Sequence, residues 1–316
     1  MKHIAIIGEC MIELNGSLFG NMQQAFGGDT LNTAIYLNRA QRAFASDESA
    51  KVSYVTAVGT DSISQGMVDA WKKEGINTEY VLTCENKTPG LYLIQLDEQG
   101  ERTFMYWRND SAARWLIQHP NFESIASQLV NVDMVYISGI TLAILPEQDR
   151  HKLLCLLKEL KVKGVELCFD SNFRPALWPH DENQSVMTAY NAMYSITDTA
   201  IVTYEDEQAL WGDKNSEETM MRLKDQGIKN VVVKLGSEGC LLSQNGKKTQ
   251  SIATTPVKNV VDTTSAGDSF NGAFLAAYLN GSKLEQACKM GNKLASIVIQ
   301  YRGAIIDPKH TQLALI

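Results

Sequence analysis

Short runs of β-branched and apolar residues alternate with longer helical patterns, and this alternation constrains the fold more than any other feature. The segment HIAIIG (3–8) ends in glycine and is typical of a strand buried on both faces. Helical patterns at 30–42 and 62–74 enclose a second strand-like run at 51–59. Strands that alternate with helices form right-handed βαβ units. The sequence therefore predicts an α/β fold, a doubly wound and mostly parallel sheet flanked by helices.

The same alternation continues through the second half of the chain. We expect further strands at 132–139, 165–172, 200–203, 230–236 and 240–244, the last followed by a hairpin turn at 245–248. We expect helices at 146–163, 186–196, 205–210, 217–224, 266–280 and 283–300. Ligands of such sheets bind beyond the carboxyl ends of the strands, so the site is expected at that edge.

One segment breaks the alternation. LYLIQLDEQGERTFMYWR (91–108) contains two aromatic, β-rich runs joined by a polar turn, which indicates an antiparallel hairpin and a small inserted sheet. Tyr106 and Arg108 are two residues apart and share one face, which Tyr92 also shares in one register. Such a face suits a polyhydroxylated or carboxylated ligand. The alternative is an amphipathic edge sheet with a solvated arginine.

The charge balance limits the ligands. Lys and Arg number 29 against 36 Asp and Glu, a net charge of −7, so the chain lacks the basic surface that nucleic-acid binding needs. An anionic substrate then requires a local cluster of cations or helix N-termini. Six scattered cysteines predict free thiols. No run of 18 apolar residues and no secretory segment occur, so we expect a cytoplasmic protein without a membrane partner.

The strongest site signal is VDTTSAGDSFNGAFLAAYLNG (261–281). Small residues at 265–267 precede a long apolar helix, and a helix start of this kind presents backbone N–H groups to an anion. Asp268 beside an anion site is unusual, and it makes sense as a base that takes a proton from an attacking hydroxyl. The alternative is a first-turn carboxylate favoured by the helix dipole.

Three weaker signals accompany it. FGGDTLN (26–32) allows close approach of a ligand to two glycines, or it is a tight turn with Asp29 or Thr30 as N-cap. KLGSEGC (234–240) is a strand that ends in a glycine-rich turn. FDSNFRPALW (169–178) places Asn172 and Arg174 past a strand, where Arg174 serves a ligand or pairs with Asp170 or Asp181.

Several motifs are absent. No GxxxxGK[ST] loop occurs, and no GxGxxG follows the first strand, which disfavours a Rossmann oxidoreductase. The five histidines and six cysteines show no metal-ligand spacing.

GGDTLN (27–32) and DTTSAGDSF (262–270) resemble the two signatures of the ribokinase-like, or PfkB, carbohydrate kinases. The resemblance covers essentially the whole chain. It implies one kinase domain over 1–316, with a β lid formed by about 10–25 and 88–110.

Within that family, four further segments resemble members that phosphorylate a sugar acid; they are 7–14, 100–110, 171–178 and 299–305. The implied reaction is ATP-dependent, Mg²⁺-assisted phosphorylation of 2-keto-3-deoxygluconate at its terminal hydroxyl. A fructokinase or ribokinase type is the alternative. A nonenzymatic sugar-acid sensor is disfavoured because Asp268 stands in its motif.

The resemblance also implies roles for single residues. Asp268 is the implied base. The implied anion hole is formed by the backbone amides of Ser265, Ala266 and Gly267, together with the amide of Asp268. The implied sugar site comprises Gly27, Gly28, Asn32, Tyr92, Tyr106, Arg108 and Arg174. The implied ATP site comprises Asn172, Lys234, Gly236 and Gly239. A homodimer through the lid, or a higher homo-oligomer, is also expected.

Two positions depart from the family pattern. The second signature usually reads DTxGAGD, and a left-handed Ser265 is disfavoured by about 1–2 kcal/mol relative to glycine. We therefore expect Ser265 to adopt an ordinary conformation, with Gly267 as the left-handed residue if one is needed. The family's NxxE motif is replaced by TYEDE (203–207), where Asp206 or Glu207 could hold Mg²⁺ through water. Two anionic ligands further predict a local positive pocket of Arg108, Arg174, Lys234 and the helix start at 266.

Overall fold

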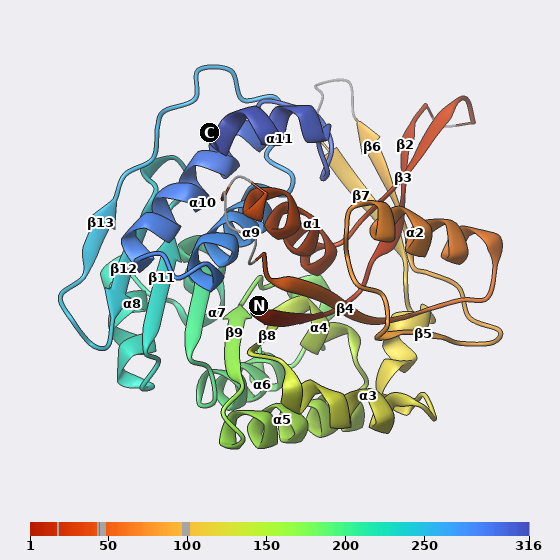
Figure 1. Cartoon of the computed structure of the whole chain (residues 1–316), viewed down its shortest axis with the longest axis horizontal. Helices are drawn as coiled ribbons and strands as arrows, with labels where there is room; N and C mark the ends of the chain where they lie inside the picture. Colours follow the sequence, from red (N-terminus) through yellow and green to blue (C-terminus); the bar gives the residue numbers. More distant parts are fainter. Residues whose placement is uncertain (18, 43, 45–48, 97–101, 316) are drawn as a thin grey trace.

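The computed structural model describes residues 1–17, 19–42, 44, 49–96 and 102–315, and most of their strands form one nine-stranded sheet (Figure 1). In spatial order its strands are β13 (Gln250–Ile252), β12 (Cys240–Gln244), β11 (Asn230–Lys234), β10 (Thr199–Thr203), β9 (Glu166–Asp170), β8 (Met134–Ser138), β1 (His3–Ile7), β4 (Lys51–Val58) and β5 (Val81–Thr83). The strands from β11 to β5 are parallel. β12 runs antiparallel to β11, and β13 runs antiparallel to β12. The predicted doubly wound sheet is confirmed.

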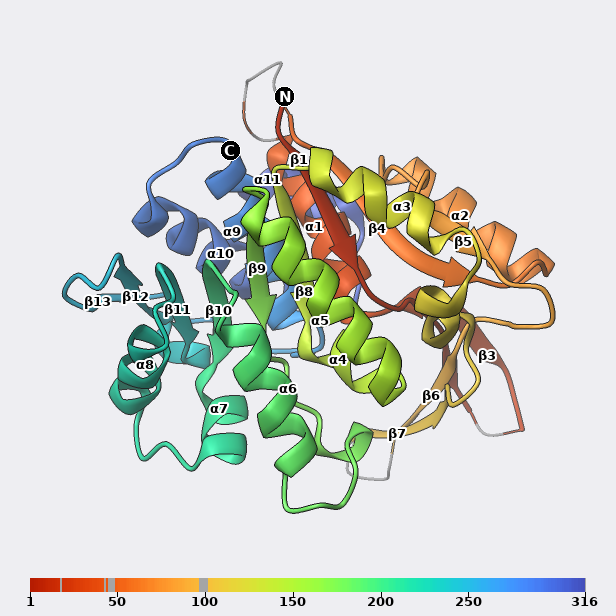
Figure 2. The same cartoon turned by 90° about the horizontal axis from the view of Figure 1, so that it is seen from below.

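Two layers of helices enclose this sheet (Figure 2). One core cluster joins the sheet to α1 (Asp29–Gln41), α2 (Ser62–Lys73), α9 (Ala266–Leu279) and α10 (Leu284–Val298), with α11 (Pro308–Leu315) outside them. The cluster on the other face includes residues of α3 (Phe122–Gln128), α4 (Gly139–Ile144), α5 (Glu147–Val162), α6 (Gln184–Tyr194), α7 (Tyr204–Trp211) and α8 (Ser216–Asp225). Short 3₁₀ helices lie at Ala112–Gln118, Leu129–Asn131, Pro175–Leu177 and Gly236–Glu238.

A second, four-stranded sheet lies beside the main one. Its order is β3 (Met22–Gly27), β2 (Met11–Gly16), β6 (Leu91–Leu96) and β7 (Arg102–Trp107). The hairpin of β6 and β7 confirms the predicted inserted sheet, and its register pairs Tyr92 directly with Tyr106. The polar turn expected at 97–101 lies outside the described residues.

Some boundaries differ from the sequence pattern. The strand expected at 165–172 ends at Asp170, because the Asp170 side chain accepts a hydrogen bond from the amide of Asn172, which turns the chain at a φ of 35°. The pattern also missed β5, α3, α4 and α11 as separate elements. These elements are short, so few residues carry their periodicity.

None of the described helices combines the length and apolarity needed to span a membrane. All six cysteines are free thiols, and only Cys155 is exposed.

The close packing of α1 against α9 positions the site, and it depends on Gly272. A Cβ on Gly272 would lie 2.7 Å from the backbone nitrogen of Leu37 and 2.7 Å from the Cβ of Tyr36. The two helices can therefore touch through their backbones, which brings Asn32 of α1 within hydrogen-bond distance of Asp268 of α9.

Gly272→Ala is expected to lower the free energy of unfolding by about 1–3 kcal/mol, because the added methyl group forces α1 and α9 apart. Urea unfolding measures the change. The matched control is Gly66→Ala on the exposed side of α2, where nothing lies within 4 Å of the new Cβ. The control is expected to be neutral or stabilising by up to about 1 kcal/mol. Equal effects of the two substitutions would contradict this account.

Candidate active site

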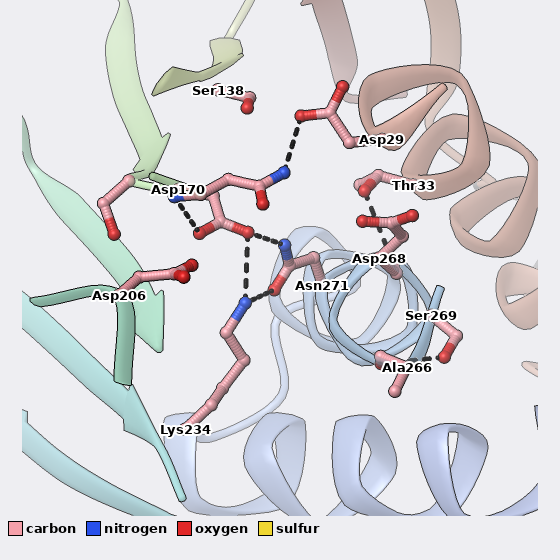
Figure 3. A network of polar contacts seen from close by, with 12 residues as sticks. Asp29, Thr33, Ser138, Asp170, Asp206, Lys234, Ala266, Asp268, Ser269 and Asn271 are labelled. Atoms are coloured by element: carbon pink, nitrogen blue, oxygen red, sulfur yellow. Dashed lines mark hydrogen bonds and ion pairs between the residues drawn. The ribbon is translucent and has the colours of Figure 1, made fainter. Parts of the chain in front are cut away.

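Asp268 lies in the first turn of α9, at the carboxyl edge of the main sheet (Figure 3). Its Oδ2 accepts hydrogen bonds from the Asn32 side-chain amide at 2.9 Å and from the Ser265 hydroxyl at 2.9 Å. Within the described ranges no donor is assigned to its Oδ1. The carboxylate is thus held on one oxygen, and the other can receive a proton.

The pKa of Asp268 is raised from 3.8 to about 7, mainly by burial and in addition by the negative charge of Asp29. The hydrogen bonds from Asn32 and Ser265 oppose this shift. Burial also raises the pKa of Asp29, whose carboxylate accepts a hydrogen bond from the Asn172 side chain at 2.8 Å. A carboxyl that titrates near neutral pH is suited to taking up a proton during a reaction.

The turn before α9 differs from the sequence prediction. Ser265 caps the helix in the left-handed region, with a φ of 64°, and Gly267 lies inside the helix. The expected assignment of these two conformations is therefore wrong. The hydrogen bond from Ser265 to Asp268 helps to offset the cost of the left-handed backbone.

The helix start offers fewer free amides than the resemblance implies. The Ala266 amide donates to the carbonyl of Thr263 at 3.2 Å, so its implied place in the anion hole is filled from within the turn. Among the described residues, the amides of Ser265, Gly267 and Asp268 have no assigned acceptor. These three can face an anion at the positive end of the helix.

Gly27, Gly28 and the small sheet lie on the side of the site formed by the N-terminal part of the chain. A Cβ on Gly28 would lie 2.2 Å from the carbonyl oxygen of Glu9, and one on Gly27 would lie 2.7 Å from the Tyr92 hydroxyl. Both glycines thus allow close approach by other parts of the chain. The rings of Tyr92 and Tyr106 lie 6.0 Å apart on one face of the sheet, Tyr92 buried and Tyr106 half-exposed.

Two carboxylates that sequence reasoning missed bind residues of this region. Arg108 is buried and donates through Nε at 2.9 Å, and also through Nη2, to Oε2 of the buried Glu9. The Tyr92 hydroxyl donates to Glu13. The only sequence signal was a charge within each of the apolar runs IIGECMI and MIEL, and that signal names no partner.

A cavity of about 360 Å³ lies at the N-terminus of α9. Lys234, Gly236 and Gly239 line it together with Ala266 and Gly267, so three of the residues expected at the nucleotide meet there. Asn172 is not among its lining residues, and its side chain instead donates to Asp29. Apolar residues complete the walls; they include Pro256, Val257, Val260, Phe270, Ala295 and Ile299.

The two acidic candidates of the altered motif separate. Glu207 is fully buried, where it accepts hydrogen bonds from Tyr194 and Arg222, so it is committed to the core beneath the site. Asp206 instead forms an ion pair with the half-exposed Arg174, with 3.3 Å between Oδ1 of Asp206 and Nη1 of Arg174. Burial raises the pKa of Asp206 to about 6, although Arg174 opposes the shift.

The three side-chain cations of the predicted positive pocket do not stand alone. Each of its three cations already has a carboxylate partner: Glu9 for Arg108, Asp206 for Arg174 and Asp170 for Lys234. The sequence could not reveal this pairing, because the partners lie 99, 32 and 64 residues apart. Among the described residues no three His, Cys, Asp or Glu side chains cluster to hold a metal ion.

A doubly wound sheet with a small sheet beside it, and with a carboxylate and free amides at one helix start, defines the class of ribokinase-like kinases. The chain belongs to the pfkB family of carbohydrate kinases, whose sequence profile matches residues 1–312. The family resemblance read from the two motifs is therefore confirmed.

Relatives and solved structures agree with this placement. The chain is 51% identical to a 2-dehydro-3-deoxygluconokinase of Haemophilus influenzae, over 97% of this chain and 96% of that protein. It is 46% identical to a 2-dehydro-3-deoxygluconokinase of Escherichia coli K12, over 96% and 97%. An E. coli protein described as a ribokinase II, solved with ATP and Mg²⁺, shares the fold with a TM-score of 0.80 at 20% identity, over 96% and 94% of the two chains.

Asp268→Asn is expected to stabilise the fold at pH 8 by on the order of 2–4 kcal/mol, and by less at pH 5. Because folding raises the pKa of Asp268 above 3.8, its stabilising protonation is complete below that pH and is lost as the pH rises through about 7. Asparagine resembles the protonated carboxyl at every pH. Urea unfolding at pH 5, 6 and 8 measures the difference.

The control for this prediction is Asp181→Asn. Hydrogen bonds from Ser185 lower the pKa of Asp181, so its ionised form stabilises the fold and the substitution is expected to destabilise at pH 8. A gain for Asp268→Asn that is larger at pH 5 than at pH 8 would contradict the assigned shift.

Proposed function

We propose that the protein is a 2-dehydro-3-deoxygluconokinase, which uses ATP to phosphorylate the terminal hydroxyl of 2-keto-3-deoxygluconate. The observation that carries the proposal is the carboxylate of Asp268, which is held on one oxygen by Asn32 and Ser265 in the same helix turn whose Ala266 and Gly267 line the Lys234 cavity. Relatives with that name, 51% and 46% identical over nearly the full length, support it.

In the proposed mechanism Asp268 accepts the proton of the terminal hydroxyl through its open Oδ1. The hydroxyl oxygen attacks the γ-phosphorus in line, and ADP leaves on the opposite side. The amides of Ser265, Gly267 and Asp268 stabilise the charge that gathers on the phosphoryl oxygens. Their preorganisation by the α9 helix keeps the reorganisation cost of the reaction small.

The cavity at Lys234, Gly236 and Gly239 is proposed to hold ATP, with its apolar walls against the adenine. When bound with the nucleotide, Mg²⁺ would supply positive charge beside the phosphates, and Asp206 would hold it through water. Asp206 fits this role because it is a largely buried carboxylate whose pKa is raised by burial, so a nearby cation stabilises its charged form. Glu207 is excluded by its contacts with Tyr194 and Arg222.

The sugar acid is proposed to lie against Gly27, Gly28 and Asn32, under the small sheet as a lid. Tyr92 and Tyr106 present hydroxyl groups and ring faces to the sugar chain. Arg108 and Arg174 are the candidate partners of its carboxylate, since a planar guanidinium matches a carboxylate. Two arginines favour an acid over the neutral sugars of a fructokinase or ribokinase.

Six free thiols and the use of ATP support a cytoplasmic enzyme. A homodimer through the lid is supported by exposed aromatic side chains on the edge strand β7, those of Phe104, Tyr106 and Trp107. The mass in solution, measured by light scattering, tests the dimer, and a monomer would overturn it.

The function is tested by a coupled ATP-consumption assay with 2-keto-3-deoxygluconate, its galactonate-derived epimer, fructose and ribose. The keto acids are expected to be the preferred substrates. Arg174→Met is expected to raise KM for the acid about tenfold or more while KM for ATP changes little, because the lost hydrogen bonds are charge-assisted. A higher kcat/KM for fructose or ribose than for the acids would overturn the assignment.

The base is tested by Asp268→Asn, which is expected to lower kcat by about 10²–10⁴-fold with ATP binding retained. In the wild type, kcat/KM is expected to rise with pH through about 7, because only the ionised carboxylate accepts a proton. Ser265→Ala removes a hydrogen bond that lowers this pKa and is expected to move the limb to higher pH. Unchanged turnover in Asp268→Asn would exclude it as the base.

A further inference from the structure

A buried ion pair lies beneath the N-terminus of α9. The ammonium of Lys234, at the carboxyl end of β11, donates to Oδ2 of Asp170 at 3.0 Å, and the two side chains are 8% and 5% exposed. Burying such a pair costs desolvation energy that an apolar pair of similar size avoids. The pair is therefore weak evidence for a purely structural role.

Asn271 fixes the geometry of this pair (Figure 3). Its Oδ1 accepts from the Lys234 ammonium at 3.2 Å, and its Nδ2 donates to Asp170 at 2.6 Å and to the Tyr136 hydroxyl at 3.0 Å. The amide thus meets a donor on one side and two acceptors on the other, so only one orientation satisfies it. Asn271 follows Asp268 by three residues and lies on a neighbouring part of the same helix face.

The position of the ammonium links the pair to the anion site. Lys234 Nζ lies 3.4 Å from the point that a Cβ on Gly267 would occupy, and both residues line the 360 Å³ cavity. Asp170 and Asn271 take two of its three N–H bonds, and the described part of the chain supplies no assigned acceptor for the third. An anion at the Gly267 amide would lie within reach of that remaining donor.

We propose that Asp170 and Asn271 are positioning residues that hold the Lys234 ammonium against the transferring phosphoryl group. This inference rests on the proposed kinase function and extends it to residues outside the motifs. Asp170 keeps the ammonium buried and directed, and Asn271 ties it to the helix that carries Asp268. The base, the amides and the cation thereby keep fixed relative positions as the γ-phosphoryl group moves from ATP to the sugar and ADP is left.

The test compares Lys234→Met with Lys229→Met. Lys229 immediately precedes the same strand, pairs with Asp198 at 2.9 Å, and is exposed at the opposite edge of the sheet. Lys234→Met is expected to lower kcat by about 10²–10³-fold, as for loss of one donor to a developing charge. Lys229→Met is expected to leave kcat unchanged. Equal kcat in Lys234→Met and the wild type would overturn the proposal.

Calorimetric titration separates a contact with the transferred group from general support of the pocket. Lys234→Met is expected to bind ADP as the wild type does, and to lose affinity for ADP with aluminium fluoride, Mg²⁺ and the sugar acid by about the factor lost in kcat. Equal losses for ADP and for the fluoride complex would show a structural role and overturn the inference.

The positioning residues are tested by Asp170→Asn and Asn271→Leu, which leave the lysine in place. Each is expected to lower kcat by about tenfold, with ADP affinity retained, because the ammonium loses part of its restraint. Urea unfolding checks that each variant is folded, and Asn271→Leu carries the test if a charge change prevents folding. Wild-type kcat in both variants would overturn their assigned role.

The outcome for the sugar acid is separate. A wild-type enzyme that phosphorylates another sugar instead would overturn the proposed substrate, and the lysine comparison would then use that sugar. Since the inference concerns the nucleotide side, its variants give a decisive result with either acceptor.

Discussion

Mutual repulsion among three buried carboxylates is the constraint on which the active site depends. Burial is the largest cause of the raised pKa of Asp268 and of Asp29; the charges of Asp29 and Asp170 raise the pKa of Asp268 further, and the charge of Asp170 raises that of Asp29. The structure treats the three groups differently: Asp170 has a cation, Asp29 has neutral donors, and Asp268 has two hydrogen bonds on one oxygen. Burial, with the charge of Asp29, raises the pKa of Asp268 to about 7, and this value suits its proposed role as the proton acceptor.

The same electrostatics changes how anions are attracted to an acidic protein. Arg108, Arg174 and Lys234 each have a carboxylate partner, so these three cations add no net charge to the site of a protein whose own net charge is −7. The paired cations act as oriented dipoles whose positive ends are fixed. The free amides of α9 add to this field without adding net charge.

The sequence predicted the elements well and the pairings poorly. Periodicity is a local property, so β1, β4, β8 to β12 and the long helices could be placed from apolar runs and caps. The contact between Arg108 and Glu9 joins residues 99 apart and depends on the fold, as does that between Lys234 and Asp170. Ser265 shows a different limit, since a hydrogen bond to Asp268 overrode the preference against a left-handed serine.

In the proposed sugar-acid site, the Arg108–Glu9 pair would also link substrate choice to the small sheet. Glu9 lies between β1 of the main sheet and β2 of the small one, and Arg108 directly follows β7. The pair thus joins the end of the small sheet to the edge of the main sheet. A sugar carboxylate that reaches Arg108 has to share the guanidinium with Glu9. Coupling free energies are reciprocal. If binding of the acid stabilises one position of the small sheet, that position binds the acid more tightly by the same free energy. A neutral sugar has no carboxylate to compete with Glu9 for the guanidinium of Arg108.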